Sequence, residues 1–525
     1  MGVFISLHAS NKIDPVQWEK AYEETLVLVD AFKFIEIQEF EKFDCKYFAA
    51  VESVERKLSS GVGWRTEGDG NYMMIAEDFF LPRKISPPKE NVEYCDPLMY
   101  IYAQNGSINF ENPYVRGLRF FWGGKTQGKP YHNALLAIGC LLDDRLNGEA
   151  LCSDDITYGQ CKYAVDMANK ILKRKIGMPL RCRIEDLYKR IRRLPIEKDQ
   201  MLEAFAATYL GVKDEQYYKF VDEHFSEEEK NFFIKKRMDN RSLGSCGFDD
   251  SIQEILSYNV PVASVCSAFL EMDSKDKKLS NGKDPYKVFV KHILDTDIYL
   301  PEKDLRNCLD VDENSAETMS VEKQFASFMF ISARNRHVAR YIPLDKLKEQ
   351  LIAAIGDKCD VGGIIDCYIA EKREKIEKQE SDSCKKLNDA HDEVNKRIQE
   401  ILKKYDVSEV EHLIFYKKGN TVEPNLLDYL KRCANFFKSL LEKPDFKEIS
   451  QLEYENKCRF LELQNKSLYL MNSVWLRIFD SIRDNPDSFK RYYVIVRTKI
   501  HSGSIHSLIR AYVENDDFYE LCQTL

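Results

Sequence analysis

The chain has 525 residues, more than a single hydrophobic core usually organises, so two to four domains are expected. Apolar residues make up 44% of it, with 30 Phe and 28 Tyr, and this composition excludes a chain that is disordered throughout. A formal net charge of −9 argues against a protein that coats nucleic acid through its overall charge. A local basic patch is still compatible with that value.

The cysteines bear on the compartment of the protein. All 15 are scattered singly and no CxxC occurs, which disfavours zinc ribbons and redox pairs. We therefore predict no metal and no other cofactor. The N-terminus lacks the pattern of a secretory signal, and the longest apolar run, residues 134–142, is about half a membrane span. A reduced, cytoplasmic protein without a membrane partner is expected.

The first 55 residues have the pattern strand, helix, strand, strand. Asp14 followed by Pro15 predicts a helix start, and apolar side chains at helical spacing continue the helix to Phe32. Residues 34–40 and 45–53 predict two strands joined by a tight turn. We predict an α+β domain, with a small, mostly antiparallel sheet that carries helices.

The remaining elements are predicted from turn residues, capping signals and helical spacing. Up to residue 185 these patterns predict loops at 59–70 and 82–97, a helix at 131–145 and a strand at 150–156. Thr157 and Gln160 predict a capping box that starts another helix, which ends near Lys173. Beyond residue 186 the pattern is almost entirely helical, with segments at 197–210, 215–238, 249–258, 284–295, 318–336, 344–355, 426–441 and 452–482. A coiled-coil-like seam spans 387–405, and 492–499 resembles a strand.

We divide the chain into an α+β domain at 1–185, a helical domain at 186–370 and a helical C-terminal domain at 371–525 with the short coiled-coil-like segment. The fold class is an α+β N-terminal domain followed by a large, mainly α-helical region.

A glycine-rich turn is the first candidate site. Gly124, Lys125 and Thr126 match the end of a phosphate-binding P-loop, in which backbone N–H groups and a lysine cradle phosphate. Arg119 stands where the first glycine of that loop is required, and Pro130 interrupts the helix that should begin at the lysine. We favour a tight turn whose proline opens a helix, and keep Lys125 and Thr126 as candidate phosphate contacts.

A histidine and two aspartates follow this turn. His132 begins the next helix, and Asp154 and Asp155 form an acidic turn after the predicted strand. His132 and Asp143 are roughly 16 Å apart along one helix, so they cannot share a metal. We favour capping roles for these residues, and retain them as candidate ligand contacts of a hydrolase. A Cys–His nucleophile pair, such as Cys161 or Cys140 with His132, is an equally unspecific alternative.

Positive charge is concentrated between residues 170 and 193. This basic block holds ten Lys and Arg residues against two acidic ones, in a chain of net charge −9. One interpretation is contact with phosphates or an acidic protein. The other is intramolecular pairing with the acidic helices that follow, such as 214–229. The candidate contacts to an anionic partner are Lys173, Arg174, Lys175, Arg181, Arg183, Arg190, Arg192 and Arg193.

Two arginine–histidine pairs are similar to the R-x4-6-H motif of helical ribonuclease domains. Arg334 and His337 lie too close in sequence for that motif, and Arg497 with His501 is one residue short. We therefore favour ordinary surface roles over a nuclease.

Residues 135–169 read LLAIGCLLDDRL…ALCSDDITYGQCKYAVDMAN. This stretch, a helix, a short strand ending in an acidic turn and Gly-Gln opening another helix, resembles uncharacterised bacterial proteins associated with toxin immunity and defence. The resemblance implies an interaction protein and no catalytic residue. We predict a non-enzymatic, cytoplasmic binding protein, an immunity or defence component that engages a protein partner. The alternative is a nucleic-acid- or nucleotide-binding protein that uses the basic block.

Overall fold

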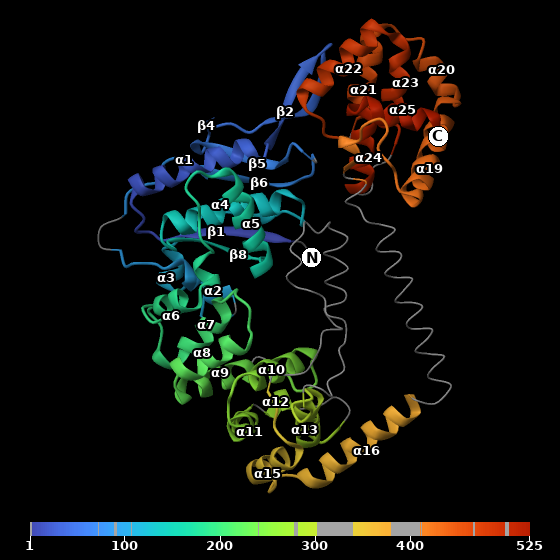
Figure 1. The fold of residues 1–525 in the computed structure, drawn as a ribbon. Helices are drawn as coiled ribbons and strands as arrows, with labels where there is room; N and C mark the ends of the chain where they lie inside the picture. Colours follow the sequence, from blue (N-terminus) through green and yellow to red (C-terminus); the bar gives the residue numbers. More distant parts are fainter. Residues whose placement is uncertain are drawn as a thin grey trace.

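The computed structural model describes residues 3–71, 73–88, 92–104, 106, 108–239, 241–272, 274–277, 282–301, 340–379, 410, 412–465, 468–498 and 503–525. All of its strands lie before residue 155, and the described elements that follow are helices (Figure 1). The predicted fold class, an α+β region followed by a mainly helical one, is confirmed. None of the described helices is long and apolar enough to cross a membrane.

A three-stranded antiparallel sheet forms the centre of the N-terminal region. Its middle strand β1 (Phe4–Ala9) pairs with β7 (Arg119–Lys125) on one side and with β8 (Ala150–Asp154) on the other. Alternate residues of β1, such as Ile5 and Leu7, are buried in the cluster formed with the helices. The helices on that face are α1 (Pro15–Ala31), α4 (Tyr131–Arg145) and α5 (Tyr158–Ile171).

The local signals for these helices are confirmed. Asp14 accepts the backbone N–H of Val16 at the start of α1. Thr157 and Gln160 form the predicted capping box of α5, which satisfies N–H groups that the first turn leaves without partners.

A second antiparallel sheet has the strand order β3-β2-β5-β4, and β6 pairs with β5. The prediction of a loop at 59–70 is wrong, because β5 occupies most of it. Its glycines suit close strand packing rather than a turn: a Cβ on Gly63 would lie 2.2 Å from the Leu81 carbonyl oxygen. The strands are β2 (Phe34–Lys42), β3 (Cys45–Glu52), β4 (Arg56–Leu58), β5 (Gly61–Asp69) and β6 (Ile75–Pro82).

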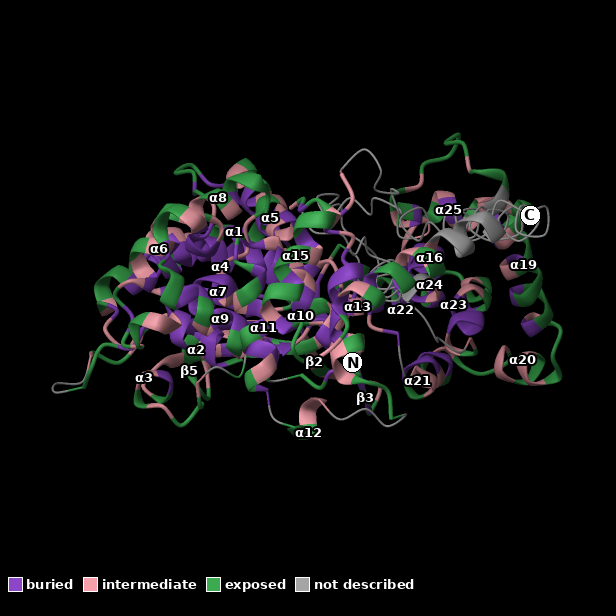
Figure 2. Ribbon diagram, turned by 90° about the horizontal axis from the view of Figure 1, so that it is seen from below, coloured by how far each residue is buried: buried purple, intermediate pink, exposed green. Residues whose placement is uncertain are grey.

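A helical region with its own hydrophobic cluster lies next to the N-terminal region (Figures 1 and 2). The helix predicted at 215–238 is interrupted at Ser226, whose hydroxyl and backbone form a capping box with Glu229 that starts a new helix. The elements are α2 (Pro97–Gln104), α3 (Pro113–Arg116), η1 (Leu180–Cys182), α6 (Ile184–Ile191), η2 (Lys198–Gln200), α7 (Met201–Thr208), α8 (Glu215–His224), α9 (Glu227–Asp239), α10 (Cys246–Ser257), α11 (Val262–Glu271), α12 (Ser274–Lys277), α13 (Pro285–Asp295), α15 (Leu344–Ile355) and α16 (Val361–Gln379).

The C-terminal helices form a third hydrophobic cluster. The strand predicted at 492–499 is a helix, because Phe489, Tyr492 and Tyr493 are buried at helical spacing and packing overrides the β-propensity of this segment. The elements are η5 (Leu413–Phe415), α19 (Pro424–Leu441), α20 (Pro444–Ile449), α21 (Tyr454–Gln464), α22 (Asn472–Asp484), η6 (Pro486–Ser488), α23 (Phe489–Val496), α24 (Gly503–Glu514) and α25 (Asp516–Thr524).

The β2–β3 hairpin reaches this third cluster (Figure 1). Tyr47 donates from its hydroxyl to Asn472 Oδ1 at 2.9 Å, and Arg459 donates to the Phe43 carbonyl oxygen at 2.9 Å. The predicted seam at 387–405, the helix at 318–336 and the residues Arg334, His337 and His501 lie outside the described residues.

Candidate functional site

Thr126 and His132, two of the predicted site residues, are buried together. The Thr126 hydroxyl and His132 Nδ1 are 2.7 Å apart, and the Thr126 hydroxyl also donates to the Val3 carbonyl oxygen at 3.3 Å. Burial lowers the pKa of His132 to about 4, so its ring is neutral near pH 7. These two side chains therefore stabilise the interior of the N-terminal domain.

Lys125, Asp154 and Asp155 lie instead at one end of strand β1. The Lys125 ammonium lies 5.4 Å from the centre of the Phe4 ring, a cation–π contact, and Asp155 Oδ2 accepts the Phe4 backbone N–H at 2.8 Å. Strand β1 separates the lysine on β7 from the aspartates at the end of β8. His132 does not join them, because its ring contacts the buried Thr126 hydroxyl instead, so the lysine, histidine and aspartates do not form one site.

These residues belong to a larger surface on the side of the three-stranded sheet that faces away from α4 and α5. It is built from alternate residues of β1, parts of β7 and β8, helix α2 and the loop that follows α2. We call it the outer face and define it by Phe4, Ser6, His8, Tyr100, Gln104, Phe110, Phe120, Lys125 and Asp154.

Asp154 links three elements of the outer face. Its carboxylate accepts hydrogen bonds from the Ser6 hydroxyl and, at 2.5 Å, from the Gln104 amide. Asp154 has a left-handed φ of 76°, which is uncommon for a residue with a Cβ. This conformation breaks the alternation of β8 and allows the carboxylate to reach Ser6 on β1.

His8 is the centre of an aromatic stack on the same face. Its ring lies 3.5 Å from Tyr100 and 5.2 Å from Phe120, measured between ring centres, and Tyr100 in turn lies 5.6 Å from Phe110. Burial lowers the pKa of His8 to about 4, and in the described part of the chain its Nε2 has no hydrogen-bond partner. The ring is therefore neutral near pH 7, and from its buried position it packs against the rings of Tyr100 and Phe120.

A glycine makes room for the Phe120 ring. A Cβ on Gly123 would lie 2.8 Å from both that ring and the Ser6 hydroxyl, so only glycine fits between them. Phe120 is nevertheless 60% exposed, Phe110 47% and Phe4 38%.

Within the outer face, Ser6 is bound to Asp154 rather than to His8, so these residues form no serine–histidine nucleophile pair.

The basic block is largely bound to the protein itself. Arg192 pairs with Glu229, which confirms intramolecular pairing for this residue, and Arg190 pairs with Asp96 and Glu149. Arg181 is buried, Arg183 pairs with Asp186, and Lys175 donates to backbone carbonyls. The other three candidate contacts, Lys173, Arg174 and Arg193, are exposed.

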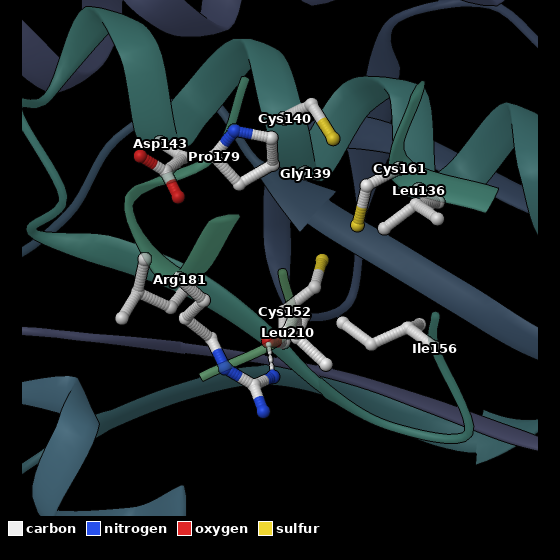
Figure 3. Close-up of a pocket in the computed structure, with 11 residues that line it drawn as sticks. Leu136, Gly139, Cys140, Asp143, Cys152, Ile156, Cys161, Pro179, Arg181 and Leu210 are labelled. Atoms are coloured by element: carbon white, nitrogen blue, oxygen red, sulfur yellow. Dashed lines mark hydrogen bonds between the residues drawn. The ribbon is translucent and has the colours of Figure 1, made fainter. Parts of the chain in front are cut away.

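Three cysteines line a small cavity, a feature that the scattered cysteine pattern did not reveal. Cys140, Cys152 and Cys161 come from α4, β8 and α5, and Figure 3 shows their sulfurs directed into one gap. The cavity has a volume of about 10 Å³, room for about one water molecule. Among the described residues, no group of three or more His, Cys, Asp and Glu side chains has a geometry that could hold a metal ion.

No family model, curated protein or solved structure with which the chain was compared matches it.

Proposed function

We propose that this chain is a non-enzymatic binding protein that engages a protein partner through the outer face. The observation that carries the proposal is the exposed pair Phe110 and Phe120, joined through the rings of Tyr100 and His8, with the exposed Phe4 on strand β1 of the same face. Large exposed aromatic side chains on a rigid element are the usual anchors of protein interfaces.

The rim of the surface supports the same proposal. Lys125 lies against the Phe4 ring, and Asp154 and Gln104 add polar groups to the same face; an apolar centre with a polar rim is the common arrangement of protein interfaces. Strands β1 and β7 carry Phe4 and Phe120, and Phe110 packs on Tyr100 of α2, so little conformational entropy is lost when a partner binds. The partner that suits this surface presents apolar side chains to the phenylalanines.

The sequence supports a biological role for this binding protein. Because residues 135–169 resemble bacterial proteins associated with immunity and defence, we propose that the chain is a cytoplasmic immunity or defence component. The basic block supports a nucleic-acid partner less well, because Arg181, Arg190 and Arg192 are occupied by protein groups.

Photo-crosslinking tests the proposal. A photoreactive phenylalanine analogue is placed at position 120 of the full chain in its native host, and at position 415 as a control, because Phe415 is similarly exposed, at 56%, outside the outer face. We expect a discrete protein adduct from position 120 only. Crosslinking to nucleic acid, or the same adducts from both positions, would overturn the proposal.

A further inference from the structure

Strand β2 has an edge that the fold leaves open, and this edge shares no residue with the outer face. Pairing of β2 with β5 covers only Phe34 and Ile35. On its other side β2 pairs with β3 along its length, from Ile35 to Lys42. The part of β2 beyond Ile35 therefore belongs to a two-stranded hairpin, which extends toward the C-terminal helices (Figure 1). We call residues 38–42 the free edge.

The register of the hairpin shows which backbone groups point outward. Ser53 donates its backbone N–H to the Phe34 carbonyl oxygen at 2.7 Å, so these two residues form a hydrogen-bonded pair. In antiparallel strands such pairs alternate with pairs whose N–H and C=O groups point away from the neighbouring strand. The register from Ile35 to Lys42 is unbroken, so Glu39 and Glu41 direct their backbone groups away from β3.

The described part of the chain does not pair with the free edge. Among the described residues, no hydrogen-bond partner meets the backbone N–H or C=O groups of Glu39 and Glu41. Both residues are exposed, and the side chain of Glu39 is 46% exposed. The backbone groups of the free edge are thus accessible to another molecule.

Two other strand edges are covered by the protein itself. On β3 the Leu470 carbonyl oxygen accepts the Ala50 backbone N–H at 2.9 Å, and on β8 Arg181 donates to the Cys152 carbonyl oxygen at 3.0 Å. Proteins usually cover strand edges in such ways, because an open edge is a template for pairing with a further strand. The free edge of β2 is accordingly a place where a strand of another molecule can add.

The side chains beside the free edge favour a positively charged strand. Glu39, Glu41 and Lys46 share one face of the hairpin, since the register places Lys46 opposite Glu41. Lys46 forms an ion pair with Glu39 at 2.7 Å, and Glu41 has no ion-pair partner among the described residues. A strand added beside β2 places its own side chains directly opposite the two glutamates, where opposite charges are favourable.

The same charges disfavour a second copy of this chain as the added strand. Antiparallel pairing of two free edges would bring Glu39 and Glu41 of one copy opposite the same residues of the other. Like charges directly opposite each other destabilise a strand pair. The occupant is therefore a strand of different sequence.

We propose that the free edge binds an extended segment of a partner protein in which Lys or Arg alternates with apolar residues. The backbone of the segment pairs with Glu39 and Glu41, and its basic side chains lie against the two carboxylates. Its apolar side chains lie on the other face, where β2 carries Phe40 in contact with the Tyr47 ring. The free edge is about 17 Å long, at about 3.4 Å per residue, so the segment needs only about five or six residues.

Peptide binding to the full chain, measured by fluorescence anisotropy, tests this inference. The probe is a fluorescein-labelled peptide of three Lys-Val repeats. The control peptide has the same sequence and charge, but its lysine backbone nitrogens are methylated and cannot donate to β2. We expect the control peptide to bind at least tenfold more weakly. Bound probe should also slow hydrogen exchange at the Glu39 and Glu41 amides.

Two variants separate the free edge from general attraction to an acidic protein. Glu41→Lys should weaken probe binding at least tenfold. Glu52→Lys is the matched control, because Glu52 is exposed at the opposite end of β3, so the same change of charge should leave binding unchanged. Circular dichroism establishes that both variants are folded.

Three results would overturn the inference. The first is a probe that does not bind, or that binds as well when its backbone is methylated. The second is an equal loss of binding in Glu41→Lys and Glu52→Lys. The third is slow exchange of the Glu39 and Glu41 amides before any peptide is added, because the edge would then already be occupied.

Discussion

At the scale of single residues, Glu462 on α21 has surroundings that are unfavourable for a charge. The residue is 4% exposed and, apart from the neighbouring Cys45 thiol, neither carboxylate oxygen has a hydrogen-bond partner among the residues that the structure describes. Burial raises the pKa of Glu462 from 4.5 to about 7, although Lys42 and Arg459 act in the opposite direction. This carboxyl lies where the β2–β3 hairpin meets the C-terminal helices, so its charge should affect stability.

The first prediction concerns the pH dependence of stability. Because the folded pKa lies above the unfolded one, the folded chain holds this proton more tightly, and stability falls as pH rises from 4.5 to about 7 and is then level. Glu462→Gln removes that loss, so near pH 8 the variant should be more stable than the wild type by roughly 1–3 kcal/mol. Near pH 4 the gain should vanish. Urea unfolding at both pH values measures this; an equal difference at both would contradict it.

Gly139 on α4 gives a second prediction. A Cβ at this position would lie 2.1 Å from the Cys152 sulfur, so Gly139→Ala should lower the free energy of unfolding by about 1–3 kcal/mol through overpacking. The control is Gly362→Ala on α16, where a Cβ would meet nothing closer than 3.5 Å and alanine favours the helix. Thermal unfolding should therefore show a lower Tm for the first variant only. A stable Gly139→Ala protein would mean that β8 moves away from α4 easily.

At the scale of elements, the β2–β3 hairpin is attached to the C-terminal helices by aromatic contacts. Phe479 on α22 meets the Phe43 ring edge-on at 5.7 Å and the Tyr47 ring edge-on at 5.9 Å, both measured between ring centres. Arg510 on α24 adds a second attachment, donating to the Gly70 carbonyl oxygen at 3.0 Å. The N-terminal and C-terminal parts of the chain are thus joined through side chains 400 or more residues apart in sequence.

Our third prediction follows from that attachment. Phe479→Ala removes a fully buried ring and should cost about 3–5 kcal/mol of stability. Leu476 lies on the same helix but is 39% exposed, so Leu476→Ala should cost much less. Chemical unfolding followed by tryptophan fluorescence compares them, since Trp475 is adjacent. Equal losses would contradict the packing described for Phe479.

Local patterns predicted elements where a signal is strong and self-contained. The patterns at 34–40 and 45–53 predicted β2 and β3, and the Thr157 capping box predicted α5. The same kind of pattern failed where a distant part of the chain decides the structure. The glycines of β5 suggested a loop, because the sequence does not show that β6 packs against them. The run 492–499 suggested a strand, because the sequence does not show that its burial partners are other helices.

The candidate site could be predicted only in part for the same reason. Lys125, Asp154 and Asp155 were recognised by residue type, but their position at one end of β1 depends on the register of strands more than a hundred residues apart. Ser6, His8 and Phe120 carry no motif, so they were missed. The pairing of Arg190 with Asp96 and Glu149 also joins distant segments, and a count of charges along the sequence does not reveal it.

At the scale of the whole molecule, the outer face lies where two hydrophobic clusters meet. Leu98, Met99 and Ile101 of α2 are buried in the helical region, whereas Tyr100 and Gln104 of the same helix contact the N-terminal sheet. Strand β8 contributes Leu151 to the helical cluster and Asp154 to the outer face. The phenylalanines are therefore held by a junction that both regions stabilise, as a binding surface requires.

The most direct test of the proposed function is the affinity of the crosslinked partner for purified variants of the full chain, measured by titration calorimetry. Phe120→Ser removes the most exposed of the three phenylalanines, and Phe415→Ser is the matched control. We expect Phe120→Ser to weaken binding by roughly tenfold or more, about 1.4 kcal/mol or more, and Phe415→Ser to leave it unchanged. Unchanged binding by Phe120→Ser, or an equal loss in both folded variants, would contradict a role for the outer face.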